Sequence, residues 1–197
     1  MNRLLLCALL FAVIPCRADT IFSLDPGPQP VSLGSQLTVN LDVTGLGGGT
    51  ALATYELLVG FDDTLLAFDN VTFGTALDPD MLGNIQTVTP NTGSVDVFEL
   101  SLDPSADLVA SQPGAFTVAT LVFDTLAAGA NSPITLADVP TGMVTSIGDQ
   151  DGNPIQASFV GASVTIVDTA PGVPEPSALV LLCSGLLAIF IRKATRC

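Results

Sequence analysis

Residues 36–43, QLTVNLDV, decide the fold, because apolar and polar side chains alternate strictly along them. Leu37, Val39, Leu41 and Val43 share one face, and polar residues occupy the other. Successive side chains of a β-strand point to opposite faces of its sheet, so this period of two predicts a half-buried strand. The stretch therefore indicates a sheet with one face packed on a core.

The same alternation returns along the chain in short runs bounded by Gly, Pro, Asn or Asp. β-Branched and aromatic residues fill the runs, as is typical of strands, while turn formers fill Asp103–Gly114 and Asp149–Pro154. No long helical pattern competes between Asp19 and Asp168. We therefore predict an all-β sandwich of eight or nine strands. The further runs are Tyr55–Phe61, Leu65–Phe73, Ser94–Leu102, Phe116–Asp124, Ile134–Val139 and Ser158–Val167.

Four stretches of this region resemble the cohesin domain in order: Gly34–Val43, Tyr55–Leu66, Gly114–Phe123 and Gly161–Val167. The second, YELLVGFDDTLL, is similar to the cohesin strand that ends in an aromatic, Asp, Pro turn before a Leu, although Asp63 stands where that Pro is usual. The resemblance implies a cohesin-like jelly-roll sandwich. Cohesins bind dockerin domains in cellulosomes, but no partner is carried over to this chain, since function depends on the site.

The N-terminal segment 1–18 is typical of a secretion signal. Arg3 precedes the apolar run Leu4–Ile14, and Cys16 and Ala18 are small residues at the end of the segment. Such an apolar core inserts at the translocon and is cleaved behind small residues, so we expect cleavage after Ala18. The run is too short for a permanent membrane helix, which needs about 20 apolar residues.

The C-terminal segment 171–197 consists of a polar hinge, an apolar segment and a basic end. In order, these parts are Pro174, Glu175 and Pro176, then Ala178–Ile191, then Arg192, Lys193 and Arg196. At about 1.5 Å per residue, a helix over the apolar part would be roughly 22 Å long, which suits only a thinned bilayer. The positive-inside tendency places the basic end in the cytoplasm and the rest of the chain outside.

This order of parts resembles the PEP-CTERM sorting tail of Gram-negative bacteria. The resemblance implies recognition by an exosortase, a membrane cysteine protease that removes the tail near the Pro-Glu-Pro motif. The chain would then cross the inner membrane, be anchored transiently, and pass to the cell surface or the extracellular matrix. The alternative is an ordinary tail anchor whose Pro-Glu-Pro only begins a helix, because Pro is tolerated in the first helical turn.

The charges are divided between the ends of the chain and its middle. All five basic residues are at positions 3, 17, 192, 193 and 196, whereas all 19 acids lie between Asp19 and Glu175. A domain without cations repels phosphate backbones and anionic lipid headgroups, which excludes nucleic-acid binding and leaves the tail as the only membrane contact. The four Cys residues are also terminal, so the domain has no disulfide.

The domain lacks the residues of common enzymes. Without His or Cys it cannot assemble the usual nucleophile and base pairs of acyl transfer. Asp62 with Asp63, and Asp78 with Asp80, are the obvious carboxylate pairs for a glycosidase, but acids at strand exits are typical of turns. We nominate no catalytic residue and expect a protein that is not an enzyme.

One loop resembles a cation site. Asp149, Asp151 and Asn153 place three oxygen-bearing side chains at alternate positions around Gly152, a pattern that converges ligands on Ca²⁺. An EF-hand loop would carry its Gly one position later and a bidentate acid beyond it, so a plain turn is the leading interpretation. No other cofactor is expected.

We expect a non-enzymatic exported protein with an interaction or structural role, whose ligand is exopolysaccharide or another surface protein. The alternative function is a carbohydrate-binding module acting on exopolysaccharide. Sugar binding usually relies on exposed flat aromatics, yet the chain has no Trp and one Tyr, Tyr55, which we expect in the core. The Phe residues of the strand-like runs are also expected in the core: Phe68, Phe73, Phe98, Phe116, Phe123 and Phe159.

Overall fold

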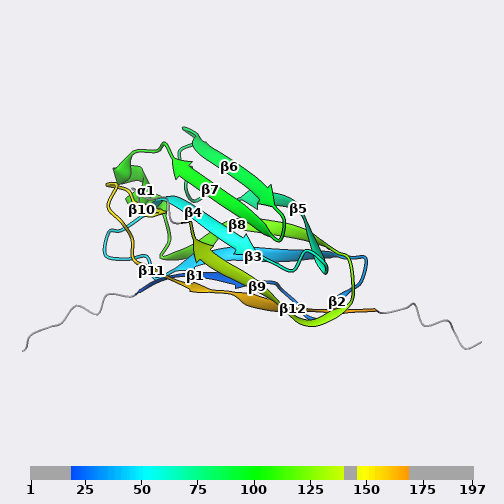
Figure 1. The fold of residues 1–197 in the computed structure, drawn as a ribbon. Coiled ribbons are helices and arrows are strands. Elements are labelled where there is room, and N and C mark those ends of the chain that lie inside the picture. The colour runs from blue at the N-terminus through cyan, green and yellow to red at the C-terminus, as the bar shows by residue number, and fades with distance from the viewer. Residues whose placement is uncertain (1–18, 140–145, 169–197) are drawn as a thin grey trace, which may run out of the picture.

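A computed structural model describes residues 19–139 and 146–168. These residues form two packed β-sheets (Figure 1), which confirms the prediction of an all-β sandwich. The predicted signal peptide and C-terminal membrane helix lie outside the described residues. Within the described ranges, no helix is long and apolar enough to cross a membrane.

The first sheet has five strands in the order β11-β1-β3-β8-β5. Its neighbours pair antiparallel, except that β11 runs parallel to β1. The strand β5 forms one edge of this sheet. The bounds are β1 (Thr20–Asp25), β3 (Gln36–Thr44), β5 (Leu66–Phe73), β8 (Ala115–Thr125) and β11 (Ala157–Val160).

The second sheet has the order β2-β12-β9-β4-β7-β6, and β10 pairs with β4 beside this path. The strand β6 forms one of its edges and follows β5 directly in the chain, so the two sheets end near one another on the same side of the sandwich (Figure 1). The bounds are β2 (Val31–Ser32), β4 (Leu52–Gly60), β6 (Asn84–Asn91), β7 (Ser94–Ser101), β9 (Gly129–Asp138), β10 (Ile147–Asp149) and β12 (Ala162–Val167).

The strand count agrees with the sequence prediction once short strands are set apart. Nine strands have six or more residues, and β2, β10 and β11 are shorter. Each predicted run falls on one observed strand, except that Ser158–Val167 covers both β11 and β12, whereas β1, β2, β6 and β10 are additional. The segment Asp103–Gly114, which is rich in turn formers, contains one short helix, α1 (Ser105–Ser111). This helix packs Leu108 inward, where the side chain is 1 % exposed.

The predicted run Ser158–Val167 is continuous in sequence but divided between the two sheets. Its first part pairs with β1, and its second part pairs with β9. Gly161 lies at the crossing, where an added Cβ would come 2.6 Å from the carbonyl oxygen of Ile134. The backbone can approach that closely only without a side chain, so this glycine permits the crossing.

The core fills the space between the sheets. The four apolar residues of 36–43 are buried, as the alternation predicts, and Tyr55 is fully buried as well. The other Phe residues of the strand-like runs lie in this core or pack against it, but Phe98 does not. The expectation that Phe98 is a core residue is therefore wrong, because its side of β7 faces outward.

Candidate functional site

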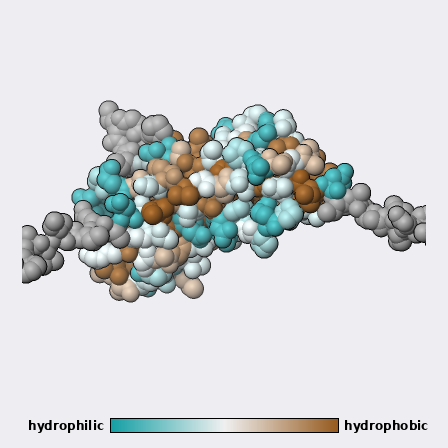
Figure 2. Space-filling view, turned by 90° about the horizontal axis from the view of Figure 1, so that it is seen from below, coloured by the Kyte–Doolittle hydropathy of each residue, from teal (hydrophilic) through white to brown (hydrophobic). Residues whose placement is uncertain are grey.

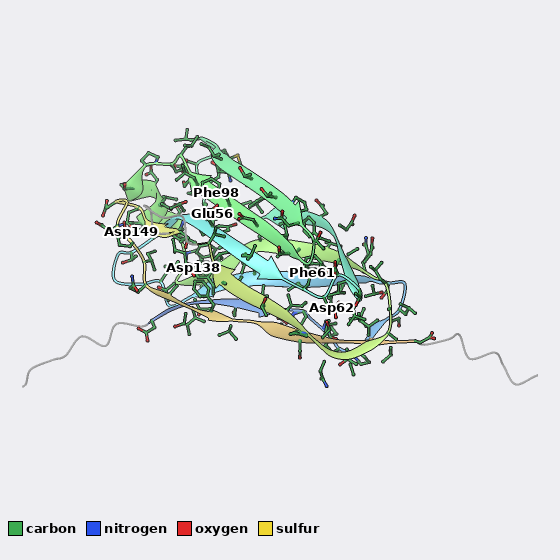
Figure 3. All side chains as sticks on the ribbon, in the orientation of Figure 1. Glu56, Phe61, Asp62, Phe98, Asp138 and Asp149 are labelled. Carbon is green, nitrogen blue, oxygen red and sulfur yellow. The ribbon has the colours of Figure 1, made fainter. Side chains whose placement is uncertain are left out.

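Apolar side chains lie on the outer face of β4, β7 and β6, where solvent-facing residues are usually polar. Leu58 and Phe98 are half-buried on the two inner strands, and Ile85 on the edge strand is 47 % exposed. Figure 3 shows Phe98 beside Glu56, its partner across β4 and β7. We define the β4–β7 face as Glu56, Leu58, Ile85, Asp96 and Phe98.

Exposed apolar residues are not confined to this face. Val160 is 50 % exposed on β11, and Leu126 is 52 % exposed after β8. Hydrophobic residues also gather along the middle of the side seen from below (Figure 2). Because much of any folded surface is apolar, exposure alone does not mark a site. The carboxylates of the β4–β7 face distinguish it.

Glu56 and Asp96 are diagonal neighbours on this face, since Glu56 pairs with Phe98 and Leu58 pairs with Asp96. Partial burial raises the pKa of Glu56, and the nearby Asp96 charge raises it further. Partial burial also raises the pKa of Asp96. Oδ1 of Asp96 is buried and accepts no hydrogen bond from the described residues.

No cation of the described chain can neutralise these acids, because residues 19–139 and 146–168 contain no Lys, Arg or His. A desolvated carboxylate oxygen without a partner costs free energy. A protein surface that brings a basic side chain to Asp96 and an apolar one to Phe98 would relieve that cost. The arrangement suits protein docking rather than chemistry on a substrate.

The suggested calcium residues form a hydrogen-bonded turn at one end of the sandwich. Oδ1 of Asp149 accepts the backbone N–H groups of Asp151 at 2.9 Å and Asn153 at 2.8 Å. Burial opposes ionisation of Asp149, but these hydrogen bonds outweigh burial and lower its pKa. The Asn153 amide also turns its nitrogen toward Asp149, so a bound ion would require that amide to rotate. Calcium binding stays a prediction, which calorimetry with added Ca²⁺ would test.

The carboxylate pairs considered for a glycosidase lie in turns. Asp62, at the opposite end of the sheet from Asp149 (Figure 3), accepts the hydroxyl and the N–H of Thr64, and these bonds lower its pKa. Asp78 accepts the N–H of Gly83 at 2.8 Å. The described residues also contain no group of three or more His, Cys, Asp or Glu that could hold a metal ion. One acid of each pair, Asp62 or Asp78, thus stabilises its own turn.

The residues that sequence reasoning missed are those of the β4–β7 face. In Ser94–Ser101, SVDVFELS, apolar residues occur at both odd and even positions, so the alternation does not reveal which face of the strand points outward. The strand pairing that brings Glu56 near Asp96 is a tertiary feature. The only sequence signal was the pair of acids within two apolar strands.

The processing residues Ala18, Pro174, Glu175, Pro176, Arg192 and Lys193 lie outside the described residues. Residues 172–194 match the family model of the PEP-CTERM protein-sorting motif, which confirms the motif predicted from the sequence. Such a motif indicates export and sorting to the cell surface in Gram-negative bacteria. No curated protein matches the chain in sequence.

Solved structures of cohesins share the fold of the described domain. The type II cohesin A11 from Bacteroides cellulosolvens is 16% identical with a TM-score of 0.62, over 75% of this chain and 99% of that one. The sixth cohesin of scaffoldin B from Acetivibrio cellulolyticus, solved with a Cel5 dockerin, is 19% identical with a TM-score of 0.58, over 76% and 99%. A non-cellulosomal cohesin from Archaeoglobus fulgidus is 15% identical with a TM-score of 0.54, over 78% and 94%. The predicted cohesin-like sandwich is confirmed.

Proposed function

We propose that this chain is a non-enzymatic exported protein that docks another surface or matrix protein through its β4–β7 face. One observation carries the proposal: Asp96 holds a buried, unpaired carboxylate oxygen beside the apolar Leu58 and Phe98, in a domain whose described residues include no cation. A partner with a basic residue and an apolar residue at matching spacing completes this surface. Partial desolvation of Asp96 in the free protein makes such a pair more favourable than an exposed one.

The proposal includes the processing of both ends. A signal peptide at 1–18 is removed after Ala18, the sandwich occupies 19–170, and an exosortase removes the tail at 171–197 after transient membrane anchoring. The domain binds no nucleic acid and reaches the membrane only through that tail. The sorting motif and the absence of Lys and Arg between residues 18 and 191 support this organisation.

Cell fractionation tests the processing. The full chain and a variant lacking residues 174–197 would be expressed in a bacterium that carries an exosortase, and the exported product weighed by mass spectrometry. We expect the full chain to reach the surface without its basic end, and the truncated variant to bypass the membrane stage. A surface product that keeps Arg192 and Lys193 would contradict exosortase cleavage.

Site-specific photo-crosslinking tests the docking. A crosslinking amino acid at position 98 should capture one defined surface protein, whereas the same amino acid at Thr38, on the outer face of the first sheet, should not. With that protein purified, Phe98→Ala should weaken binding about 30-fold, because central aromatic residues dominate interface energies. Thr38→Ala is the matched control. Equal crosslinking from both positions, or unchanged affinity of the Phe98 variant, would refute the docking face.

The β4–β7 face does not favour the alternative of sugar binding. It contains no Trp or Tyr, and its one aromatic side chain, Phe98, lies beside the carboxylate of Glu56. Sugar platforms usually use larger exposed rings. A protein partner is therefore the better occupant of this face.

A further inference from the structure

A second site opens where the two sheets end at β5 and β6, on the other side of β6 from the β4–β7 face. A pocket of about 480 Å³ lies there, a volume within the range of small-molecule sites. Phe73 at the end of β5 forms one wall, Asn84 and Gln86 of β6 another, and Thr75, Asp78 and Met81 of the connecting loop the rim. Met81 is 89 % exposed.

Behind this pocket lies a buried carboxylate that has no cationic partner among the described residues. Glu99 on β7 is 0 % exposed. Its Oε1 accepts the side-chain amide N–H groups of Asn84 at 2.6 Å and Gln86 at 3.0 Å, and its Oε2 accepts the hydroxyl of Tyr55 at 3.0 Å. Burial raises the pKa of Glu99, and these three hydrogen bonds oppose that rise.

The Glu99 contacts fix how the pocket presents its polar atoms. Because both amide nitrogens face the buried carboxylate, both amide oxygens point away from it. Oδ1 of Asn84 is not among the buried unpaired atoms of the described residues, and no described group donates to it, so it faces solvent. Oδ1 of Asp78 accepts the backbone N–H of Gly83. Its Oδ2 is not among the buried unpaired atoms of the described residues and accepts no hydrogen bond from them, so it faces solvent as well.

We propose that this edge pocket binds a primary alkylammonium group. Its three N–H donors match the open oxygens of Asn84, Gln86 and Asp78, and its alkyl chain lies against Phe73 and Met81. The bound cation supplies the positive charge that Glu99 lacks, since the amides link its carboxylate to the pocket. This site is additional to the proposed docking function and stands without it.

The chemistry of the lining disfavours other ligands. Asp78 and the charge of Glu99 repel an anion. A bare metal ion is disfavoured because the described residues hold no group of carboxylates arranged around one. A neutral sugar gains nothing from the negative potential. The ammonium can belong to a free polyamine or to a lysine side chain of another protein, and the experiment separates these two sources.

Nuclear magnetic resonance of the full chain in a non-ionic detergent tests the proposal with matched four-carbon probes. Butylammonium should shift the backbone and side-chain amide signals of Asn84 and Gln86 at concentrations up to about 50 mM, whereas butanol and butyrate should not. Spermidine represents a free polyamine and Nα-acetyl-lysine-methylamide a protein side chain. The probe that binds more tightly identifies the source.

Variants separate a built site from general attraction to an acidic protein. Asp78→Asn should weaken butylammonium binding about tenfold, and Gln86→Ala about fivefold, corresponding to the loss of one charged and one neutral hydrogen bond. Asp124→Asn makes the same charge change on the first sheet and should have no effect. Thr87→Ala, on the opposite side of β6, should leave this site intact.

Three results would overturn the proposal. Equal weakening by Asp78→Asn and Asp124→Asn would mean general charge attraction. Binding of butanol or of glucose at Asn84 and Gln86 would mean a neutral ligand. No shift of these signals with any amine would mean that no ammonium site exists. None of these results concerns Phe98, so the docking function is tested independently of the ammonium site.

Discussion

The outer faces of the two sheets use their polar side chains differently. On the first sheet, Thr120 donates to Asn40 at 3.0 Å across β3 and β8, and Thr117 donates to Asp42 at 2.5 Å. On the second sheet, Asp96 has a carboxylate oxygen with no described partner beside Leu58 and Phe98. The first face pairs these polar side chains with one another, whereas the second leaves a carboxylate oxygen without a partner among the described residues.

The largest effect should come from breaking a pair on the outer face of the first sheet. Asp42→Ala removes the acceptor of the Thr117 hydroxyl and should lower the free energy of unfolding by about 1–2 kcal/mol, because hydrogen bonds to charged groups exceed neutral ones. Urea denaturation measures the change. Thr117→Ser keeps the hydroxyl and should retain most of the stability. An unchanged midpoint for the Asp42 variant would show that this face gains nothing from its pairs.

The opposite sign is expected on the β4–β7 face. Asp96→Asn removes a partly desolvated charge whose Oδ1 has no partner among the described residues, so the variant should be about 0.5–1 kcal/mol more stable than the native chain at neutral pH, after allowance for solvent screening. Asp42→Asn is the matched control and should destabilise. If both substitutions change stability in the same direction, the two faces do not differ as described. The Asp96 variant should also bind the crosslinked partner more weakly.

A smaller effect is expected from pH. Because the folded pKa of Asp96 and Glu56 is raised, the native state takes up protons before the unfolded chain as the pH falls. Stability should therefore rise between neutral pH and the ordinary carboxyl range near 4. Urea midpoints at about pH 7 and about pH 5 should show a rise that is smaller in the Asp96→Asn variant by a few tenths of a kcal/mol.

Asp62 and Asp149 act in a separate pH window. Their folded pKa values are lowered, so the stability they contribute is present above the ordinary carboxyl range and is lost as the pH falls below it. The measurement between pH 7 and pH 5 therefore avoids their titration. A native chain that loses stability over that interval would contradict the raised pKa values of the β4–β7 face.

The fold was predictable because its strands carry a strong alternating pattern. In residues 36–43, the side chains at odd positions are buried and those at even positions face outward, so β3 follows from the sequence alone. β6 does not, because Asn84–Asn91 is largely exposed on both sides and contains Pro90, which weakens a strand prediction. The crossing at Gly161 was also hidden, since alternation continues through it while the pairing partner changes.

The site was less predictable because it depends on which of the two alternating sets of β7 side chains faces the core. In Ser94–Ser101, the outward residues include Phe98 and Leu100, and the inward ones include Glu99. Hydrophobicity alone would place Phe98 inside and Glu99 outside. The structure reverses them, because Tyr55, Asn84 and Gln86 supply hydrogen bonds to Glu99. Those partners come from other strands and are not visible in the local sequence.

The position of β12 determines how the domain transmits mechanical force. The last strand, β12, ends at Val167, and its end lies at the other end of the molecule from the start of β1 (Figure 1). Hydrogen bonds lie across the strand direction, so a pull on that end loads the bonds to β9 and β2 together in shear instead of peeling them one by one. The same sheet carries Phe98, so tension between the end of β12 and a partner docked on the β4–β7 face would run through one hydrogen-bonded layer and would spare the apolar contact between the two sheets.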